Sequence, residues 1–393
     1  MKLGKETFGS MQELFLGLAL MIGLLLPHTS RMLLFINPLL CIVFFYKKKD
    51  RNICREGWAP IIAIIVSIVF NMAGQASGKS LLTAASILLC IVAFPMVNNV
   101  RLKNIYIYLC FGLIFISQVG YMLHLGFVTS IIDKLYPITW GEDFITIANE
   151  HASIDNYLHF RLGGLYRNPN HCAKYVTFLM AIYIVFNRDK SIIKLAGFLA
   201  LCYLSVIMTG SRTGFAIGNI LVLFAFLKNN KKSSFMRIVV TFGILALMIY
   251  NISSGGGGRG AKLEEGFHGS ADMKWKLLMD YLAHEDSIIH YLIGHLDLQL
   301  FNPSFDVNYS FDAEYGYMIY CFGFIGFFAL VYYFYKISCH IEKQNRVFLI
   351  VALWMLTSSI FFAYRAVFVF MLLLSTIYRR TPSNISKLYK QRV

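Results

Sequence analysis

Arginine, asparagine and histidine side chains stand directly before an apolar run in the segment RLGGLYRNPNHCAKY, residues 161–175. Arg161 and Arg167 carry permanently charged guanidinium groups whose planar arrangement of donors suits phosphate oxygens. Asn170 follows a proline, so it is a candidate N-cap for the helix that the apolar run predicts. Because a helix N-terminus also presents unpaired backbone N–H groups, this combination predicts a binding site for an anion.

The same combination recurs twice further along the chain. In MTGSRTGFAIGNI, Ser211 is a candidate N-cap and Arg212 falls in the first turn of the next apolar run. In FFAYRAVF, Arg365 stands in a very short connection at the start of the last apolar run. Three helix N-termini that each carry an arginine would form one anion site if they converge in space.

Structural interpretations of these features remain open. A single arginine at a helix end often extends to lipid headgroups, and this is the alternative for Arg365. The spacing of Gly210, Gly214 and Gly218 is typical of a face on which two helices pack closely, so we interpret these glycines as structural. That packing favours a functional role for Arg212, because a charged side chain beside a close-packed face is not expected to point at lipid.

Histidines and carboxylates gather in AHEDSIIHYLIGHLDLQ, residues 283–299, and DVNYSFDAEYGYMIYCFGFIG, residues 306–326. The candidates are His284, His290, His295, Asp297, Asp306, Asp312 and Glu314. Groups of these types can accept the proton of a hydroxyl as a general base. Two alternatives stay open, namely that His290 is a structural histidine and that Asp312 caps the helix that follows it.

The composition shows which elements must position these residues. The chain of 393 residues is 57% hydrophobic and 15% charged, with a mean hydropathy of +0.60. Uncharged runs of about 15–20 residues recur along it, and such runs cross a hydrocarbon core of about 30 Å as helices. We predict an all-α polytopic membrane protein with about twelve spans, near 11–27, 32–46, 58–74, 80–98, 105–123, 175–187, 195–209, 212–227, 238–252, 315–335, 347–363 and 364–378.

The distribution of charge predicts the orientation. With the N-terminus in the cytoplasm, the two tails and alternate connections hold 24 of the 36 Lys and Arg residues, as cytoplasmic segments should. The other side holds 15 of the 21 Asp and Glu residues. Both termini are therefore expected in the cytoplasm, and the basic pI indicates contact with anionic lipid rather than with nucleic acid.

Two connections on the outer side are long, 124–174 and 253–314, within what we take as a single integral membrane domain over 1–393. The second opens with the flexible segment SSGGGGRG. It continues through ADMKWKLLMDYLAHEDSIIHYL, whose apolar residues recur at helical spacing. We expect an amphipathic helix there that lies on the membrane surface or caps a cavity.

The absence of several known motifs excludes some kinds of cofactor and metal site. The sequence contains no P-loop, no HExxH and no acidic pair of the DxD type, so we expect neither a metal ion nor another cofactor. An anion that arginines neutralise without a metal at the outer membrane surface suggests a lipid-linked pyrophosphate.

These motifs, in this order, resemble the O-antigen polymerase (Wzy-type) and O-antigen ligase superfamily. The resemblance covers about 160–335: RLGGLYRNPNHCAKY, then MTGSRTGF, then a large outer connection with YLIGHLDL that leads into FDAEYGYMIYCFGFIGFFALVYYFY. It implies a GT-C-like fold and a metal-independent, inverting glycosyltransferase. On the matching positions, Arg161, Arg167 and Arg212 would contact the pyrophosphate, and His295 or Asp312 would be the general base.

The function expected from this resemblance is that of a polysaccharide polymerase in lipopolysaccharide biosynthesis. It would transfer a growing glycan from undecaprenyl pyrophosphate to a lipid-linked repeat unit at the periplasmic face of the bacterial inner membrane. The expected partners are that lipid-linked oligosaccharide and membrane lipids, with a chain-length regulator as a further candidate. The alternatives are a ligase that transfers polymer to lipid A core and a flippase or transporter of the lipid-linked unit. A transporter predicts charges at helix centres, which are nearly absent here.

Overall fold

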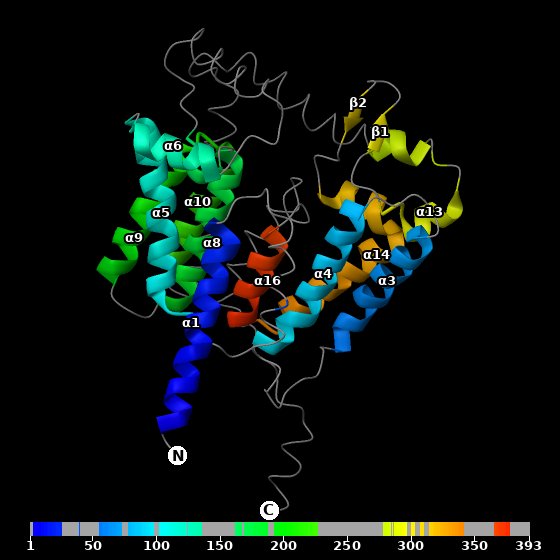
Figure 1. The fold of residues 1–393 in the computed structure, drawn as a ribbon, viewed down its shortest axis with the longest axis horizontal. Helices are drawn as coiled ribbons and strands as arrows, with labels where there is room; N and C mark the ends of the chain where they lie inside the picture. Colours follow the sequence, from blue (N-terminus) through cyan, green and yellow to red (C-terminus); the bar gives the residue numbers. More distant parts are fainter. Residues whose placement is uncertain are drawn as a thin grey trace, which may run out of the picture.

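The computed structural model describes residues 3–25, 39, 55–72, 78–97, 102–123, 125–135, 162–166, 169–187, 192–226, 278–283, 285, 287–296, 300–302, 307–309, 314–341 and 365–377. Most of them are helical (Figure 1). The longer helices are α1 (Leu3–Leu25), α3 (Trp58–Met72), α4 (Gly78–Val97), α5 (Asn104–Met122), α8 (Pro169–Asn187), α9 (Ile192–Met208), α10 (Arg212–Phe226), α14 (Glu314–Cys339) and α16 (Arg365–Ile377). The shorter elements are η1 (Arg55–Gly57), α6 (Gly126–Leu135), η2 (Gly164–Tyr166), α13 (Ile288–Ile293) and the antiparallel strands β1 (Leu300–Asn302) and β2 (Val307–Tyr309).

The long helices coincide with spans expected from hydropathy. Nine of the twelve expected spans each fall on one of the nine long helices, with ends that differ by up to eight residues, the largest difference being at the start of α1. The other three, 32–46, 238–252 and 347–363, lie outside the described residues apart from Leu39. The nine helix positions are therefore confirmed, and the total of twelve spans stays a prediction.

Two of the described helices are long and apolar enough to cross a membrane, Asn104–Met122 and Met318–Cys339. Large apolar side chains also stay exposed on the outside of α3, α5 and α14. Val69 is 64% exposed, Ile116 60% and Phe328 62%. Water-soluble proteins rarely expose wide apolar surfaces, whereas a helix that faces lipid does so without cost. The described structure is thus that of a mainly helical protein with two candidate membrane spans.

Helix α16 lies between two groups of helices. Figure 1 shows α5, α8, α9 and α10 on one side of it and α3, α4 and α14 on the other. Phe370 of α16 contacts both groups, with its ring centroid 6.1 Å from that of Phe178 in α8 and 5.9 Å from that of Phe334 in α14. Among the described helices α8 is deeply enclosed, since every side chain from 172 to 184 is buried. One continuous apolar core therefore joins the two groups.

Glycines allow α10 to pack closely on its neighbours. A Cβ atom added at Gly214 would come 2.8 Å from the Cβ atom of Ala173 in α8, which is closer than side chains pack. A Cβ atom at Gly218 would meet the ring of Tyr203 in α9 at 3.4 Å. Gly210 has a φ of +59°, which favours glycine, in the turn before α10. The structural interpretation is therefore confirmed for Gly214, through close packing, and for Gly210, through its backbone conformation, whereas Gly218 is at ordinary contact distance from Tyr203.

The expected amphipathic helix of the second long connection is interrupted. Residues 278–283 are helical, but Glu285 and Ser287 are not, and α13 begins only at Ile288. Ser287 is extended, with φ of −101° and ψ of +111°. The interruption arises because a side chain competes with the helical hydrogen bonds, and it creates the site described next.

Candidate functional site

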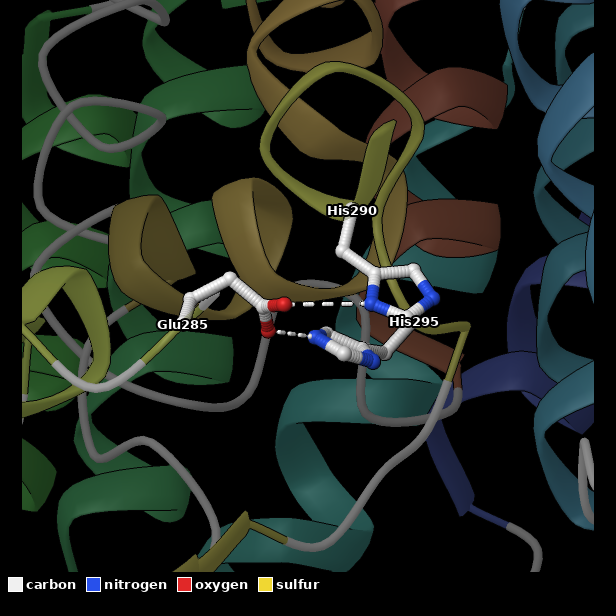
Figure 2. Close-up of side chains that lie close together, drawn as sticks. All are labelled: Glu285, His290 and His295. Carbon is white, nitrogen blue, oxygen red and sulfur yellow. Dashed lines mark hydrogen bonds and ion pairs between the residues drawn. The ribbon is translucent and has the colours of Figure 1, made fainter. Parts of the chain in front are cut away.

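The carboxylate of Glu285 holds two imidazole rings, those of His290 and His295 (Figure 2). Nδ1 of His290 donates to Oε1 of Glu285 over 3.1 Å, and Nε2 of His295 donates to Oε2. The two rings lie against each other with their centroids 4.0 Å apart. The Glu285 side chain is 11% exposed, that of His295 24% and that of His290 33%. This His-Glu-His cluster is therefore partly buried but still reached by solvent.

Glu285 is fixed at the break between the two helical segments. Its backbone N–H donates to the carbonyl oxygen of Tyr281 at 3.1 Å. Its Oε1 atom accepts the backbone N–H of Ser287 at 3.0 Å, so the side chain takes the place of a helical carbonyl. The hydroxyl of Tyr291 is shared between the carbonyl oxygens of Leu282 and Glu285, at 2.5 and 2.9 Å. These bonds end the helical segment 278–283 and orient the carboxylate of Glu285 toward α13.

The two histidines are held by α3 and α14. His290 lies in α13, and its ring makes a T-shaped contact with that of Phe70 in α3, with the centroids 6.0 Å apart. His295 follows α13, and its backbone N–H donates to the carbonyl oxygen of Tyr320 in α14 at 2.8 Å. The imidazole of His295 stacks on the ring of Tyr320 with a centroid distance of 5.0 Å. Both rings are thus supported by the helical core and not only by their own segment.

The electrostatics favour an ionised carboxylate. Burial, the largest single influence, acts to raise the pKa of Glu285, but hydrogen bonds from Ser287, His295 and His290 together bring it below its ordinary value. The pKa of Tyr281 is raised, first by burial and then by the negative charge of Glu285 nearby. At neutral pH the cluster therefore contains an ionised carboxylate that accepts a hydrogen bond from each of the two imidazole rings.

An ionised carboxylate between two imidazoles supports two kinds of chemistry. A neutral imidazole that donates one ring N–H to a carboxylate has its basic nitrogen at the other ring position, where it can accept a proton from a substrate. The same residues can also bind a cation, because the ligand atoms of Glu285, His290 and His295 all lie within 4.8 Å of one another. They form one group of metal-ligand type within the described ranges, although the sequence predicted no metal site.

Among the residues predicted to be catalytic, His295 is the one whose side chain the structure describes. Asp312, the alternative base, lies outside the described residues, and so do Arg161 and Arg167. His290 was open to interpretation as a structural histidine. The structure brings it to the same carboxylate as His295, so the two histidines form one unit.

The predicted cap of α10 is confirmed. The backbone N–H of Gly214 donates to Oγ of Ser211 at 3.2 Å, which is the bond that an N-cap residue makes. The backbone N–H of Ser211 donates in turn to Oγ1 of Thr209 at 3.2 Å. Arg212 is the first residue of the helix, as expected, while its side chain lies outside the described part.

The start of α8 requires one correction. The helix begins at Pro169, a residue type that suits the first helical position because its missing N–H is not needed there. Asn170 is therefore the second residue of the helix and not its N-cap. The position before Pro169 belongs to Asn168, which lies outside the described residues. Arg365 is the first residue of α16, as expected, and its side chain is likewise not described.

The starts of α8, α10 and α16 are connected at one end of the helix bundle. The second turn of α8 meets the first turn of α10 at Ala173 and Gly214. Tyr175 of α8 stacks on Tyr166, with a centroid distance of 4.8 Å. The hydroxyl of Tyr166 donates to the carbonyl oxygen of Leu24 at 3.0 Å, in the last turn of α1.

The end of α1 also leads to α16. A Cβ atom at Gly23 would come 2.9 Å from the side chain of Val369 and 3.1 Å from that of Phe368, in the first turns of α16. Figure 1 shows α13, which carries His290, on the opposite side of α16 from α10. Helix α16, which begins at Arg365, therefore lies between the group that contains α8 and α10 and the group that contains α14.

No sequence pattern identified two residues that the structure places in this region. Glu285 was counted among the outer acids, but no pattern in the sequence singled it out as the partner of both histidines. Lys174, in the second turn of α8, was not considered, yet its side chain is only 1% exposed. The available signal was its charge, because Lys174 is the one Lys, Arg, Asp or Glu residue of α8 and an ionisable residue inside a membrane bundle is usually functional.

Comparisons with protein-family models, curated proteins and solved structures gave no match to this chain.

Proposed function

We propose that the protein is a polysaccharide polymerase of the O-antigen type, working at the periplasmic face of the bacterial inner membrane. It transfers a growing glycan from undecaprenyl pyrophosphate to a hydroxyl group on the terminal sugar of an incoming lipid-linked repeat unit. The His-Glu-His cluster carries the proposal, because transfer to a hydroxyl needs a proton acceptor whereas transport of the same lipid does not.

In the proposed reaction, the acceptor oxygen attacks the anomeric carbon of the donor sugar from the face opposite the pyrophosphate. The bond between this carbon and the pyrophosphate oxygen breaks, and the undecaprenyl pyrophosphate leaves with the electron pair. The proton of the acceptor hydroxyl passes to an imidazole of His290 or His295. Glu285 stabilises the imidazolium that forms, since an ionised carboxylate lies beside both rings.

The leaving pyrophosphate gains charge as the bond breaks, so groups that bind it more tightly at that point accelerate the step. Arg212 and Arg365 begin helices whose N-termini add partial positive charge. Lys174 lies one to two turns inside the neighbouring start of α8. What supports this assignment is that contacts at Gly214, Tyr166 and Gly23 link these three helix starts at one end of the bundle. Catalysis of this kind requires no metal ion.

A strain that lacks the gene tests the proposal. Its envelope polysaccharide is compared on a gel with that of the same strain carrying wild type, His295→Gln or, as a matched control, His340→Gln. His340 follows α14 at the opposite end from the cluster, so its replacement should not matter. Immunoblots of the membrane fraction confirm equal amounts of protein.

A polymerase predicts that the deletion strain makes lipid A core with a single repeat unit, and that wild type and His340→Gln restore long chains while His295→Gln does not. Bare core together with long chains on undecaprenyl pyrophosphate would instead identify a ligase. Bare core without lipid-linked polymer would indicate transport, and the proposal would then be abandoned.

A further inference from the structure

We propose that Glu285, His290 and His295 form a binding site for a divalent transition metal ion of the Zn²⁺ class. Two imidazole nitrogens and one carboxylate oxygen are a common ligand set for zinc, with the fourth position left to water. The set does not suit Mg²⁺ or Ca²⁺, which take oxygen ligands. The proposal concerns binding and does not depend on the polymerase function.

The distances fit such an ion. Ligand atoms of a tetrahedral zinc site lie about 2.1 Å from the metal and hence about 3.4 Å from one another. Oε1 of Glu285 and Nδ1 of His290 are 3.1 Å apart, and the three ligand atoms all lie within 4.8 Å. Figure 2 shows the two ring nitrogens directed at the carboxylate from the same side. Small side-chain movements would therefore exchange two hydrogen bonds for three metal bonds.

The charge of the cluster also fits. With both rings neutral, the three side chains carry the single negative charge of Glu285, whose lowered pKa keeps it ionised at neutral pH. A divalent cation would change this local charge from −1 to +1, and the proton of each ring would move from the nitrogen that faces Glu285 to the other ring nitrogen. Partial exposure of His290 and His295 leaves a path for the ion to enter from solvent.

The surrounding structure holds the ligands in advance. Glu285 is fixed through Ser287 and Tyr291, and His295 through its backbone bond to Tyr320. His290 lies on α13, which packs against α14. A site built on fixed elements loses little conformational freedom on binding, so the affinity should exceed that of scattered surface histidines.

Metal binding has a consequence for the proposed reaction. A ring nitrogen that coordinates a metal leaves its imidazole with an N–H at the other position, so the ring can no longer accept a proton. A bound ion would therefore inhibit glycan transfer at this site. This consequence rests on the proposed function, whereas the binding itself does not.

The test is a titration of purified, metal-stripped, full-length protein in detergent with Co²⁺, followed by visible absorption, and then displacement by Zn²⁺. The variants are Glu285→Gln and His290→Ala, with His340→Ala as the matched control. His290 is the more exposed of the two histidines, so its replacement is the less disruptive one. The thermal unfolding temperature is measured with and without Zn²⁺ for each protein.

Wild type and His340→Ala should bind one Co²⁺ more tightly than the two cluster variants by at least tenfold. Their unfolding temperature should rise with Zn²⁺ and not with Mg²⁺, and that of the cluster variants should rise less. Absence of Co²⁺ binding by wild type, or equal binding by folded Glu285→Gln and His290→Ala, would overturn the proposal. Either result would leave the outcome of the polysaccharide test unchanged. Failure of the metal-site proposal can therefore be distinguished from failure of the polymerase proposal.

Discussion

Gly294 and Gly323 lie in backbone contact where the histidine-bearing segment crosses α14. A Cβ atom on Gly294 would come 2.5 Å from the backbone nitrogen of Gly323, and both residues have positive φ, +86° and +64°. Asn71 of α3 donates to the carbonyl oxygen of Gly294 at 3.0 Å and so holds the crossing from the other side. His295 follows directly and is thereby fixed over Tyr320.

Replacement of Gly294 by alanine should therefore destabilise the protein. The added methyl group meets the backbone of α14, and the positive φ is unfavourable for alanine. We therefore expect the free energy of unfolding to fall by more than about 1 kcal/mol. The measurement is thermal unfolding of the purified protein in detergent. Gly112→Ala in α5 is the matched control, because no atom lies within 4 Å of a Cβ added there. An unfolding temperature of Gly294→Ala that equals that of Gly112→Ala would contradict the tight crossing.

Replacement of Arg212 by alanine should abolish polymer while the protein remains in the membrane. Removal of one preorganised donor to a developing anion typically slows a reaction by about 100- to 1000-fold. Arg212→Lys should recover part of the activity, because lysine keeps the charge but lacks the planar fork. The readout is the length of polysaccharide in the complemented deletion strain.

The control for Arg212 is Lys336→Gln, which removes a cation from the last turn of α14, at the opposite end of that helix from the His-Glu-His cluster. Long polymer from Arg212→Ala at normal protein level would exclude this residue from the site. Loss of polymer from both variants would indicate a general effect of charge and not a local one.

Replacement of Lys174 by methionine should separate activity from stability. The Lys174 side chain is 1% exposed in α8, and methionine is about as long as the apolar stem of lysine, so the substitution removes the charge and keeps most of the packing. If Lys174 binds the pyrophosphate, Lys174→Met should lose polymer although its unfolding temperature is not lowered. A variant that still makes long polymer would show that the buried lysine has a structural role alone.

Replacement of Ser211 by alanine should weaken the start of α10. The hydroxyl accepts the N–H of Gly214, and loss of such a cap typically costs about 1 kcal/mol. Ser211→Asp, which can restore the cap, should unfold at a higher temperature than Ser211→Ala. Equal unfolding temperatures for these two variants and wild type would mean that the cap contributes nothing measurable.

Much of the fold could be predicted from the sequence. Long apolar runs that cross a membrane fold as helices, because each helix satisfies its own backbone hydrogen bonds where no water is present. For the same local reason Ser211 could be recognised as a cap, and Arg212 and Arg365 as first residues of helices. Asn170 failed as a cap because proline is also well suited to the first helical position, which moved the helix start by one residue.

The candidate site depended on tertiary structure. The spacing of apolar residues indicated a continuous helix through Glu285, and the bonds that break it there involve Ser287 and Tyr291 and become visible only in three dimensions. The position of His295 depends on the crossing with α14, far away in the sequence. The sequence by itself determined where the nine long helices lie and that Arg212 and Arg365 begin two of them, since hydropathy and capping are local. Only the tertiary structure decided that one carboxylate holds two histidines, because that arrangement requires α3 and α14 to position the segment between them.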